Sequence, residues 1–338
     1  MRALLIGGTG NISLSVSRLL LEQGWELTLL NRGHHNDLVP GAEALVADIN
    51  DEAQVRGFLA GRTFDVVVQF IAYHRREVFR DVNLFSGITG QYIFISTASA
   101  YQKPPRNYLI TESTPLHNPY WQYSRDKALC ERLLMEAYDM DFFPVTIVRP
   151  SHTYGLAKLP LAIHGGKGCW QVLERMRRQK PVLIPGDGTS LWTLTWSDDF
   201  ARGLVGLMGN HRAIGQAVHI TSDEALSWNQ IHKTVSDVLG VPFIPCHVPS
   251  DSLSMAESYD FSGTLLGDKS NCAMFDNRKL KSLVPGFAAR TRFDQGARLV
   301  VEHMLNTPAL QTADPAFDAF CDKVVDVMRR AEAEIALL

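Results

Sequence analysis

Hydrophobic residues in the first half of the chain fall into short runs, separated by polar turns and by segments with helical spacing. Six runs predict buried strands: Ala3–Ile6, Leu27–Leu30, Leu45–Ala47, Val66–Phe70, Tyr92–Ile95 and Val145–Val148. Between them, Asn11–Glu22 and Tyr123–Tyr138 carry their apolar residues along one helical stripe. Strands that alternate with helices in this way predict an α/β protein with a parallel sheet covered on both faces.

The pattern loosens after Pro150, where loops such as His164–Gly168 are rich in glycine. It resumes with a predicted helix over Asp198–Met208. The tail Ala316–Leu338 has amphipathic helical spacing and is predicted to pack on the body of the protein. Segments of the sheet and of a second, smaller unit therefore interleave along the chain.

Composition excludes several classes of protein. The chain has 338 residues, of which 46% are hydrophobic and 20% charged, so it is long enough for a full core and unlike a disordered regulator. Its 33 Lys and Arg against 36 Asp and Glu give a net charge of −3, which offers no global attraction to nucleic acid or to an anionic membrane.

The five cysteines are scattered without a C-x-x-C pair, and no H-E-x-x-H motif occurs, so we expect neither a disulfide framework nor a metal site. The N-terminal residues run directly from a predicted strand into glycines, unlike a secretory signal. No apolar run approaches the roughly 18 residues of a membrane helix. We therefore expect a soluble, cytoplasmic protein.

A glycine-rich loop, Gly7-Gly8-Thr9-Gly10-Asn11-Ile12-Ser13, joins the first predicted strand to the first predicted helix. A tight turn alone would also use glycines here. Between a strand and a helix N-terminus, however, such a loop lets backbone N–H groups approach a pyrophosphate. The predicted cofactor contacts in this loop are Gly7, Thr9, Gly10, Asn11 and Ile12.

The end of the second strand bears on the choice of dinucleotide. A carboxylate there would bind the adenosine ribose of NAD, but this chain has Asn31 and Arg32 instead. Asn31 can still bind a ribose, while Arg32 can hold a 2′-phosphate, which favours NADP slightly and leaves NAD open. The predicted cofactor contacts on the following strands are Asp48, Ile49, Phe70, Ile71 and Ala72.

Tyr123 and Lys127 are four residues apart in a predicted helix and therefore lie on one face. An ammonium beside a phenol lowers the phenol pKa, so Tyr123 is predicted to act as a proton carrier near neutral pH. The preceding strand ends in Ser96-Thr97-Ala98-Ser99-Ala100-Tyr101, which delivers hydroxyl groups to the edge of the sheet where ligands bind.

These motifs resemble those of the short-chain dehydrogenase/reductase superfamily, and in particular its extended branch, the NAD-dependent epimerase/dehydratase family. The resemblance covers nearly the whole chain and includes these segments in the expected order: Gly7–Ser13, Ser96–Tyr101, Tyr123 with Lys127, Val148–Gly155, Gly186–Gly188, Ser197–Ala201 and Phe275–Leu280. It implies a doubly wound Rossmann sheet formed by residues 1–165 and 187–222. A smaller, interleaved substrate-binding domain would comprise residues 166–186 and 223–338.

The resemblance also implies roles for individual residues. Thr97 would bind the substrate oxygen, Tyr123 would carry the proton, and Lys127 would hold the nicotinamide ribose during hydride transfer. Further cofactor contacts would be Ser96, Pro150 and His152, and the substrate candidates are Tyr73, His74, Ser99 and Trp192.

Two departures from the family narrow the chemistry. The 4,6-dehydratases of the family place Asp-Glu after the catalytic threonine, whereas this chain has Ala98-Ser99, which disfavours dehydration. Where nucleotide-sugar enzymes of the family commonly have an arginine for the substrate diphosphate, this chain has Trp192. Lys167, Arg175, Arg177 or Arg178 would have to supply that charge, although each alone is more simply a solvated helix residue.

The sub-branch that these motifs resemble contains chloroplast stem-loop-binding proteins and bacterial relatives. The sequence therefore predicts an NAD(P)-dependent oxidoreductase or epimerase acting on a sugar or a sugar-nucleotide-like substrate, and the resemblance implies a homodimer. The alternative is a nucleotide-sensing or RNA-binding protein on the same fold, which the acidic charge balance disfavours.

Overall fold

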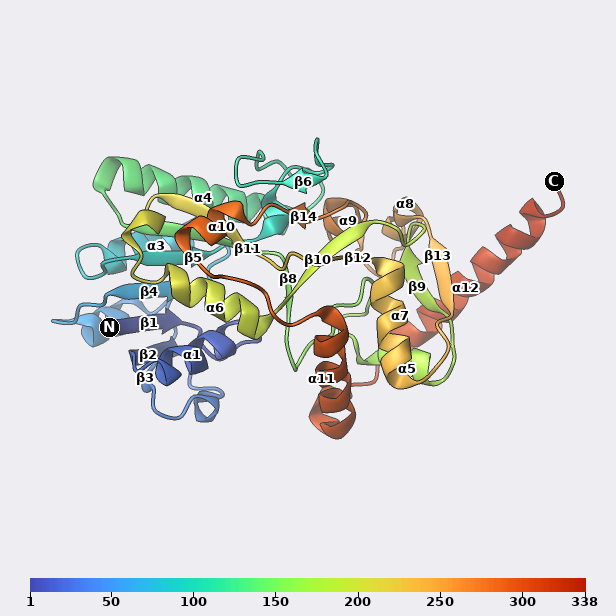
Figure 1. Ribbon diagram of the computed structural model, residues 1–338, viewed down its shortest axis with the longest axis horizontal. Coiled ribbons are helices and arrows are strands. Elements are labelled where there is room, and N and C mark those ends of the chain that lie inside the picture. The colour runs from blue at the N-terminus through green and yellow to red at the C-terminus, as the bar shows by residue number, and fades with distance from the viewer.

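The computed structural model describes residues 1–338 as two lobes that lie side by side (Figure 1). The N-terminal lobe is built on a seven-stranded parallel sheet with the order β11-β7-β5-β4-β1-β2-β3. Its strands are β1 (Arg2–Ile6), β2 (Glu26–Asn31), β3 (Glu43–Val46), β4 (Val66–Gln69), β5 (Tyr92–Ile95), β7 (Val145–Pro150) and β11 (Gln216–Ile220). The predicted doubly wound α/β fold is confirmed.

The seventh strand, β11, was not predicted from the hydrophobic pattern. It carries the polar residues Gln216 and His219 within five positions, which breaks the continuous apolar run that marks the other strands. His219 is nevertheless fully buried, because its ring bonds to the Tyr101 hydroxyl and to the Asp276 carbonyl. Buried hydrogen bonds thus replace apolar contacts at this edge of the sheet.

Each central strand supplies both faces of the sheet, because successive side chains point in opposite directions. On β1, Ala3 and Leu5 join the core under one helical layer, and Leu4 and Ile6 join the core under the other. The first layer contains α1 (Ser13–Glu22), α6 (Ser197–Leu207) and α10 (Arg278–Leu283). The second layer contains α2 (Glu52–Leu59), α3 (Arg75–Phe85) and α4 (Gln122–Asp141).

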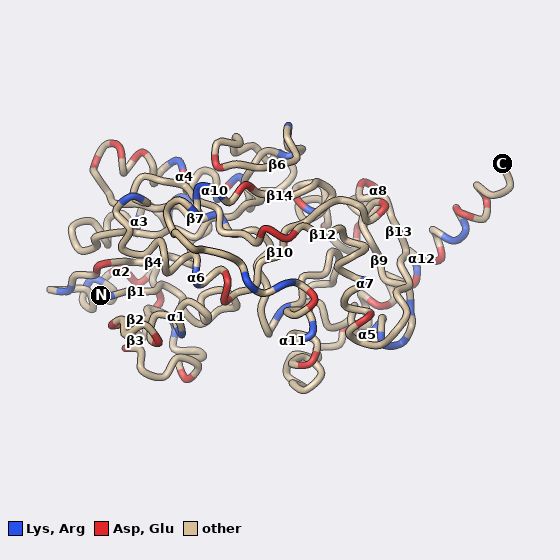
Figure 2. Tube along the Cα trace, in the orientation of Figure 1, with Lys and Arg blue, Asp and Glu red and all other residues tan.

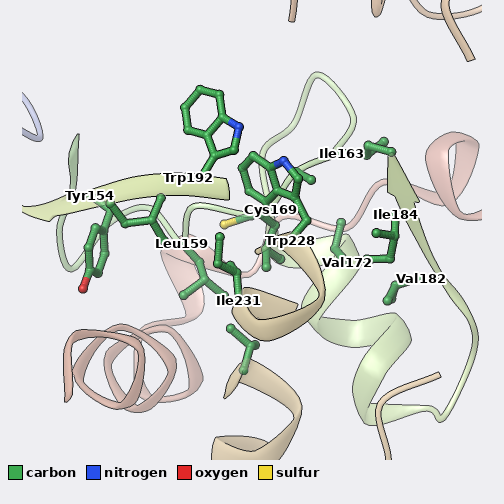
Figure 3. Close-up of a cluster of buried hydrophobic side chains, with 14 of the residues drawn as sticks. Tyr154, Leu159, Ile163, Cys169, Val172, Val182, Ile184, Trp192, Trp228 and Ile231 are labelled. Carbon is green, nitrogen blue, oxygen red and sulfur yellow. The ribbon is translucent and has the colours of Figure 1, made fainter. Parts of the chain in front are cut away.

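The second lobe surrounds its own core, part of which is drawn in Figure 3. Its sheets are β12-β10-β8 and β13-β9, formed by β8 (His152–Tyr154), β9 (Val182–Pro185), β10 (Leu191–Trp196), β12 (Ala225–Ser227) and β13 (Pro245–Val248). Its helices are α5 (Trp170–Arg177), α7 (Trp228–Leu239), α8 (Ser250–Ser254), α9 (Ser262–Thr264), α11 (Phe293–Asn306) and α12 (Pro315–Ile335). A short parallel pair, β6 (Leu109–Ile110) and β14 (Met274–Phe275), joins the loop after β5 to the segment before α10.

The chain crosses between the lobes several times, so the second lobe is not one continuous stretch. Leu280, Leu283 and Phe287 pack in the core of the first lobe, although they follow the segments that build the second. We therefore propose the division into two parts that the sequence predicts, with one change: the segment that contains Leu280, Leu283 and Phe287 belongs to the Rossmann part.

The C-terminal helix α12 is anchored only along its first turns. Phe317, Cys321 and Val325 are buried, whereas Ile335 is 67% exposed, and the end of the helix projects from the body (Figure 1). The predicted packing along the whole tail is thus wrong for its last turns, where the helix extends beyond the surface that it covers. None of the helices has the length and apolarity that crossing a membrane requires.

Arg175 is paired with residues at the start of α12, so the interpretation of Arg175 as a solvated residue is wrong. Its guanidinium is almost fully buried and donates to the carboxylates of Asp318 at 2.7 Å and Asp322 at 2.8 Å. A cation paired in this way fastens α12 to α5 and is not free to bind a substrate.

The anchoring of α12 predicts different effects at its two ends. Phe317→Ala removes a fully buried ring and should lower the free energy of unfolding by about 3–5 kcal/mol. Deletion of residues 331–338 removes mostly exposed side chains and should change it by less than about 0.5 kcal/mol. Urea unfolding followed by circular dichroism measures both values, and equal losses would contradict this description of the helix.

Candidate active site

A cleft of about 910 Å³ lies at the carboxyl ends of β1, β2, β3 and β4. Most of the residues predicted from the sequence to contact a dinucleotide line it: Gly7, Thr9, Gly10, Asn11, Ile12, Asn31, Arg32, Asp48, Ile49, Phe70 and Ile71. The edge of the sheet therefore gathers residues from four separate loops into one surface, where α/β sheets bind their ligands.

The glycine loop has the shape that a pyrophosphate site needs. Gly7 has φ of +110°, and a Cβ atom there would come within 3.3 Å of the Phe70 Cβ. No side chain caps the N-terminus of α1, and its first turn contains no acidic residue. Free backbone N–H groups and the positive end of the helix thus face the cleft beside a loop without side-chain bulk, which fits the diphosphate of NAD(P).

The end of β2 carries positive charge and no carboxylate. The Asn31 side chain is engaged locally, because its Oδ1 accepts from the Gly33 N–H at 2.8 Å and its Nδ2 donates to the Asn36 Oδ1 at 2.7 Å. Arg32 is exposed and has no ion-pair partner, and His34 and His35 line the same part of the cleft. The two histidines were not predicted as cofactor contacts; their position beside Arg32 is the signal that could have suggested them.

A second cavity of about 440 Å³ adjoins this cleft. Residues common to both linings form the junction: Ile12, Phe70, Tyr73, Ile95, Thr153 and Lys158. The smaller cavity, called here the catalytic pocket, brings together Thr97, Tyr123 and Lys127. It also takes in Ser96, Ser99, Pro150, His152 and Trp192 from the predicted set.

Lys127 is buried between α4 and the sheet. Its Nζ donates hydrogen bonds of 2.7 Å to the backbone carbonyls of Ala72 and Ile95, where β4 and β5 end. Burial lowers the Lys127 pKa to about 8. An ammonium has three N–H donors, so one remains without a protein partner in the catalytic pocket. Ala72 thus contributes its carbonyl, and its side chain lines neither cavity, contrary to the predicted cofactor contact.

Tyr123 lies one helical turn before Lys127, as the spacing predicts, but its acidity differs from the prediction. Burial raises the Tyr123 pKa to about 12, against a smaller lowering by a hydrogen bond with Thr97. The ammonium of Lys127 is directed to carbonyl groups and does not offset the loss of hydration. In this structure the phenol is therefore a neutral donor, placed beside the hydroxyl of Thr97, and the expected low pKa is wrong.

The hydroxyl groups around Thr97 form a chain. Thr97 caps the short turn that follows β5, and its Oγ1 lies 3.0 Å from the Ser99 Oγ, which in turn lies 2.7 Å from the Ser124 Oγ on α4. The Ser96 hydroxyl instead donates to the buried Glu131 carboxylate, which is paired with Arg149. Thr97 is thus held in the pocket, while the Ser96 side chain is committed to the support of α4.

Two predicted substrate residues do not have the expected positions. His74 lies outside both linings, where its Nδ1 is 3.4 Å from the Asp126 carboxylate. Trp192 borders the catalytic pocket but is only 3% exposed. Its indole N–H donates to the Lys269 carbonyl, and its ring centroid lies 5.3 Å from that of Trp228. It is therefore a wall residue packed in the core, with little free face for a sugar.

Several charged and titratable residues of the pocket were not predicted as site residues: Lys103, Lys158, His164, Asp268 and Lys269. They come from loops far apart in the sequence. Asp268 and Lys269 are adjacent opposite charges, which is the one local signal in the sequence that points to a site here.

The match to known families agrees with this geometry. The model of the NAD dependent epimerase/dehydratase family matches residues 3–221, which is more than half of the chain. This protein belongs to that family. Both the predicted family and its Rossmann architecture are therefore confirmed.

The relatives differ in what their names describe. The chain is 25% identical to a 2′-dehydrokanamycin reductase of Streptomyces kanamyceticus, over 86% of this chain and 81% of the relative. It is 24% identical to chloroplast stem-loop binding protein of 41 kDa b of Arabidopsis thaliana, over 71% of this chain and 64% of the relative. The predicted resemblance to that sub-branch is confirmed.

Solved structures show the same fold at low sequence identity. The epimerase Mth375 of Methanothermobacter thermautotrophicus has a TM-score of 0.74 at 15% identity, covering 92% of this chain and 94% of its own. The UDP-glucose 4-epimerase of Thermotoga maritima has a TM-score of 0.72 at 20% identity, covering 91% of this chain and all of its own.

The raised Tyr123 pKa predicts that the free protein contains no Tyr123 phenolate at neutral pH. The ultraviolet difference spectrum of wild type minus Tyr123→Phe should show no tyrosinate band at any pH up to about 10, because the phenol pKa is about 12. Tyr108→Phe, at a residue 67% exposed, provides the control for an ordinary tyrosine. A tyrosinate band from Tyr123 with a midpoint below pH 8 would contradict the burial argument.

Proposed function

We propose that this protein is an NAD(P)-dependent oxidoreductase that reversibly reduces a carbonyl carbon of a carbohydrate-like substrate. The observation that carries the proposal is that Thr97, Tyr123 and Lys127 line one pocket, and that this pocket adjoins the cleft lined by the residues expected to bind a dinucleotide. Reduction rather than epimerisation is favoured because the relative that matches along 86% of the chain is a reductase.

The residues divide the chemistry among them. The bound cofactor supplies a hydride to the carbonyl carbon. The Tyr123 phenol donates its proton to the carbonyl oxygen, so that C=O becomes CH–OH, and Thr97 holds that oxygen by a hydrogen bond. Lys127, one turn away, would hold the nicotinamide ribose with its remaining N–H donor, and solvent reprotonates the phenolate that is left on Tyr123. A phenol that is neutral at pH 7 is the form that a reductase requires at the start of its cycle.

A family fold does not by itself establish catalysis. The RNA-binding alternative rests on the name of one relative. In this protein, acidic and basic residues are interspersed over both lobes (Figure 2). The net charge of −3 also provides no long-range attraction to phosphate backbones, so the enzyme proposal is favoured. Cytoplasmic location and a homodimer stay predictions.

The role of Tyr123 is tested by Tyr123→Phe, which removes the proton donor and keeps the ring. Turnover of NADPH with a panel of keto sugars should fall by about 10²–10⁴-fold, because that is the usual contribution of a positioned acid. The dissociation constant of NADPH should stay within about threefold of the wild-type value. The proposal would be falsified if the variant retained wild-type turnover with an accepted substrate, and Tyr108→Phe serves as the matched surface control.

The preference for NADP is tested at Arg32. Arg32→Glu should weaken the binding of NADPH by about 10–100-fold, since a charge-assisted contact with the 2′-phosphate is lost and repulsion is added. NADH has no 2′-phosphate, and its affinity should change little. Isothermal titration calorimetry with both cofactors measures the ratio. Equal losses for the two cofactors would show that Arg32 does not select the phosphate.

A further inference from the structure

The catalytic pocket carries more positive than negative charge. Its lining contains four lysines, Lys103, Lys127, Lys158 and Lys269, and one carboxylate, Asp268. Two of these lysines already have a role, because Lys127 is bound to the ends of β4 and β5 and Lys103 lies 3.6 Å from the Asp268 carboxylate. The charge that remains comes from Lys158 and Lys269.

Lys269 is a buried cation without a carboxylate bonded to it. It is 7% exposed, and its Nζ donates to the Ala162 carbonyl at 2.7 Å. The neighbouring Asp268 faces Lys103 instead. Burial lowers the Lys269 pKa to about 8; the charge of Asp268 opposes this lowering in part, and Lys158 adds to it. A buried charge in this condition costs free energy that an anionic ligand would recover.

Two imidazoles border the same positive charge. Burial lowers the pKa of His152, and it lowers that of His164 to about 4; Lys269 and Lys158 lower both further. The His164 Nδ1 lies 2.9 Å from the Gly165 carbonyl, and the His152 ring makes no hydrogen bond within the protein, although its backbone pairs with Leu194 of β10. Both rings therefore have nitrogen atoms available to a ligand in the pocket.

The core of the second lobe limits the room beside this charge. Figure 3 shows Trp192 and Trp228 beside each other at the edge of the apolar cluster. Their indole N–H groups donate to one atom, the Lys269 carbonyl, at 3.3 and 2.9 Å. The backbone of Lys269 is thus fixed by the two indoles, while its ammonium donates to the Ala162 carbonyl. Trp192 contributes bulk and no charge to the pocket lining.

We propose that Lys158 and Lys269, with His152 and His164, form a subsite for a single anionic group on a compact carbohydrate. That group is a carboxylate or a phosphate monoester rather than a nucleotide diphosphate. This inference rests on the proposed function, which identifies the catalytic pocket as the place where the substrate reacts. It adds the chemical class of substrate that the pocket binds.

The test compares ligands that differ in charge and in the presence of a nucleotide. NADP⁺-loaded protein is titrated calorimetrically with inorganic phosphate, glucose 6-phosphate, glucuronate, glucose and UDP-glucose. We expect glucose 6-phosphate or glucuronate to bind at least tenfold more tightly than glucose and more tightly than UDP-glucose. Inorganic phosphate should bind saturably and compete with the anionic sugar.

Variants assign the binding to the subsite. Lys269→Met should reduce the preference for the anionic sugar to within about twofold of glucose and leave the dissociation constant of NADP⁺ unchanged, because Lys269 does not line the cofactor cleft. Lys158→Met, at an exposed residue that borders both cavities, should give the same loss of anion preference at saturating NADP⁺ if the buried substitution impairs folding. Lys233→Met, at a surface lysine paired with Asp237, is the matched control and should have no effect.

Each other result contradicts the subsite. Equal binding of glucose and the anionic sugars, tightest binding of UDP-glucose, no saturable binding of any anion, or an anion preference that survives Lys269→Met would overturn it. The proposed function fails separately, if Tyr123→Phe leaves turnover intact. The difference in phosphate binding between wild type and Lys269→Met reports on the subsite even in that case.

Discussion

The buried ammonium of Lys127 is the interaction on which the site depends. It joins three elements, because a side chain of α4 donates to the backbone at the ends of β4 and β5. Hydrogen bonds from a charged donor are stronger than neutral ones, and a lysine buried in this way can be retained only if it keeps such partners. The register of α4 against the sheet is thereby fixed, and Tyr123, one turn earlier, is held beside Thr97.

The same helix is supported one turn further on by a second buried charge. The Glu131 carboxylate accepts a hydrogen bond from the Ser96 hydroxyl and forms an ion pair with Arg149 of β7. The guanidinium carbon of Arg149 in turn lies 4.8 Å from the centroid of the Tyr101 ring. Lys127 and Glu131 thus fix α4 to three neighbouring strands by polar contacts inside an apolar layer. Such contacts have a defined direction, which apolar packing does not provide. The position of the catalytic pair follows from this support.

Local patterns in the sequence were sufficient for the architecture and for part of the site. Apolar runs predicted six of the seven strands of the main sheet. They did not predict β11, because this strand contains His219, which is buried through hydrogen bonds and interrupts the apolar run. Residues that follow a strand directly, such as Thr97 and Arg32, could be placed because strand ends share one edge of the sheet. Lys103 and Asp268 could not, because they are 165 positions apart and meet only through tertiary packing.

The acidity of Tyr123 shows a further limit of sequence reasoning. Spacing correctly placed Tyr123 one turn from Lys127, but its pKa depends on burial by side chains from other segments, such as Tyr73 from the loop after β4. The prediction of Trp192 as a substrate contact was wrong for a related reason. A tryptophan that contacts a ligand and one that is packed in a pocket wall have the same sequence signature.

The most direct test of the central claim is equilibrium binding of NAD⁺, NADH, NADP⁺ and NADPH to the purified protein, with measurement of any cofactor that survives purification. We predict reversible binding with NADPH preferred, which is the behaviour of a reductase that exchanges its cofactor in each turnover. Retained NAD(H) that does not exchange would indicate an epimerase instead. Binding of none of the four would contradict the assignment of the cleft and of the enzyme.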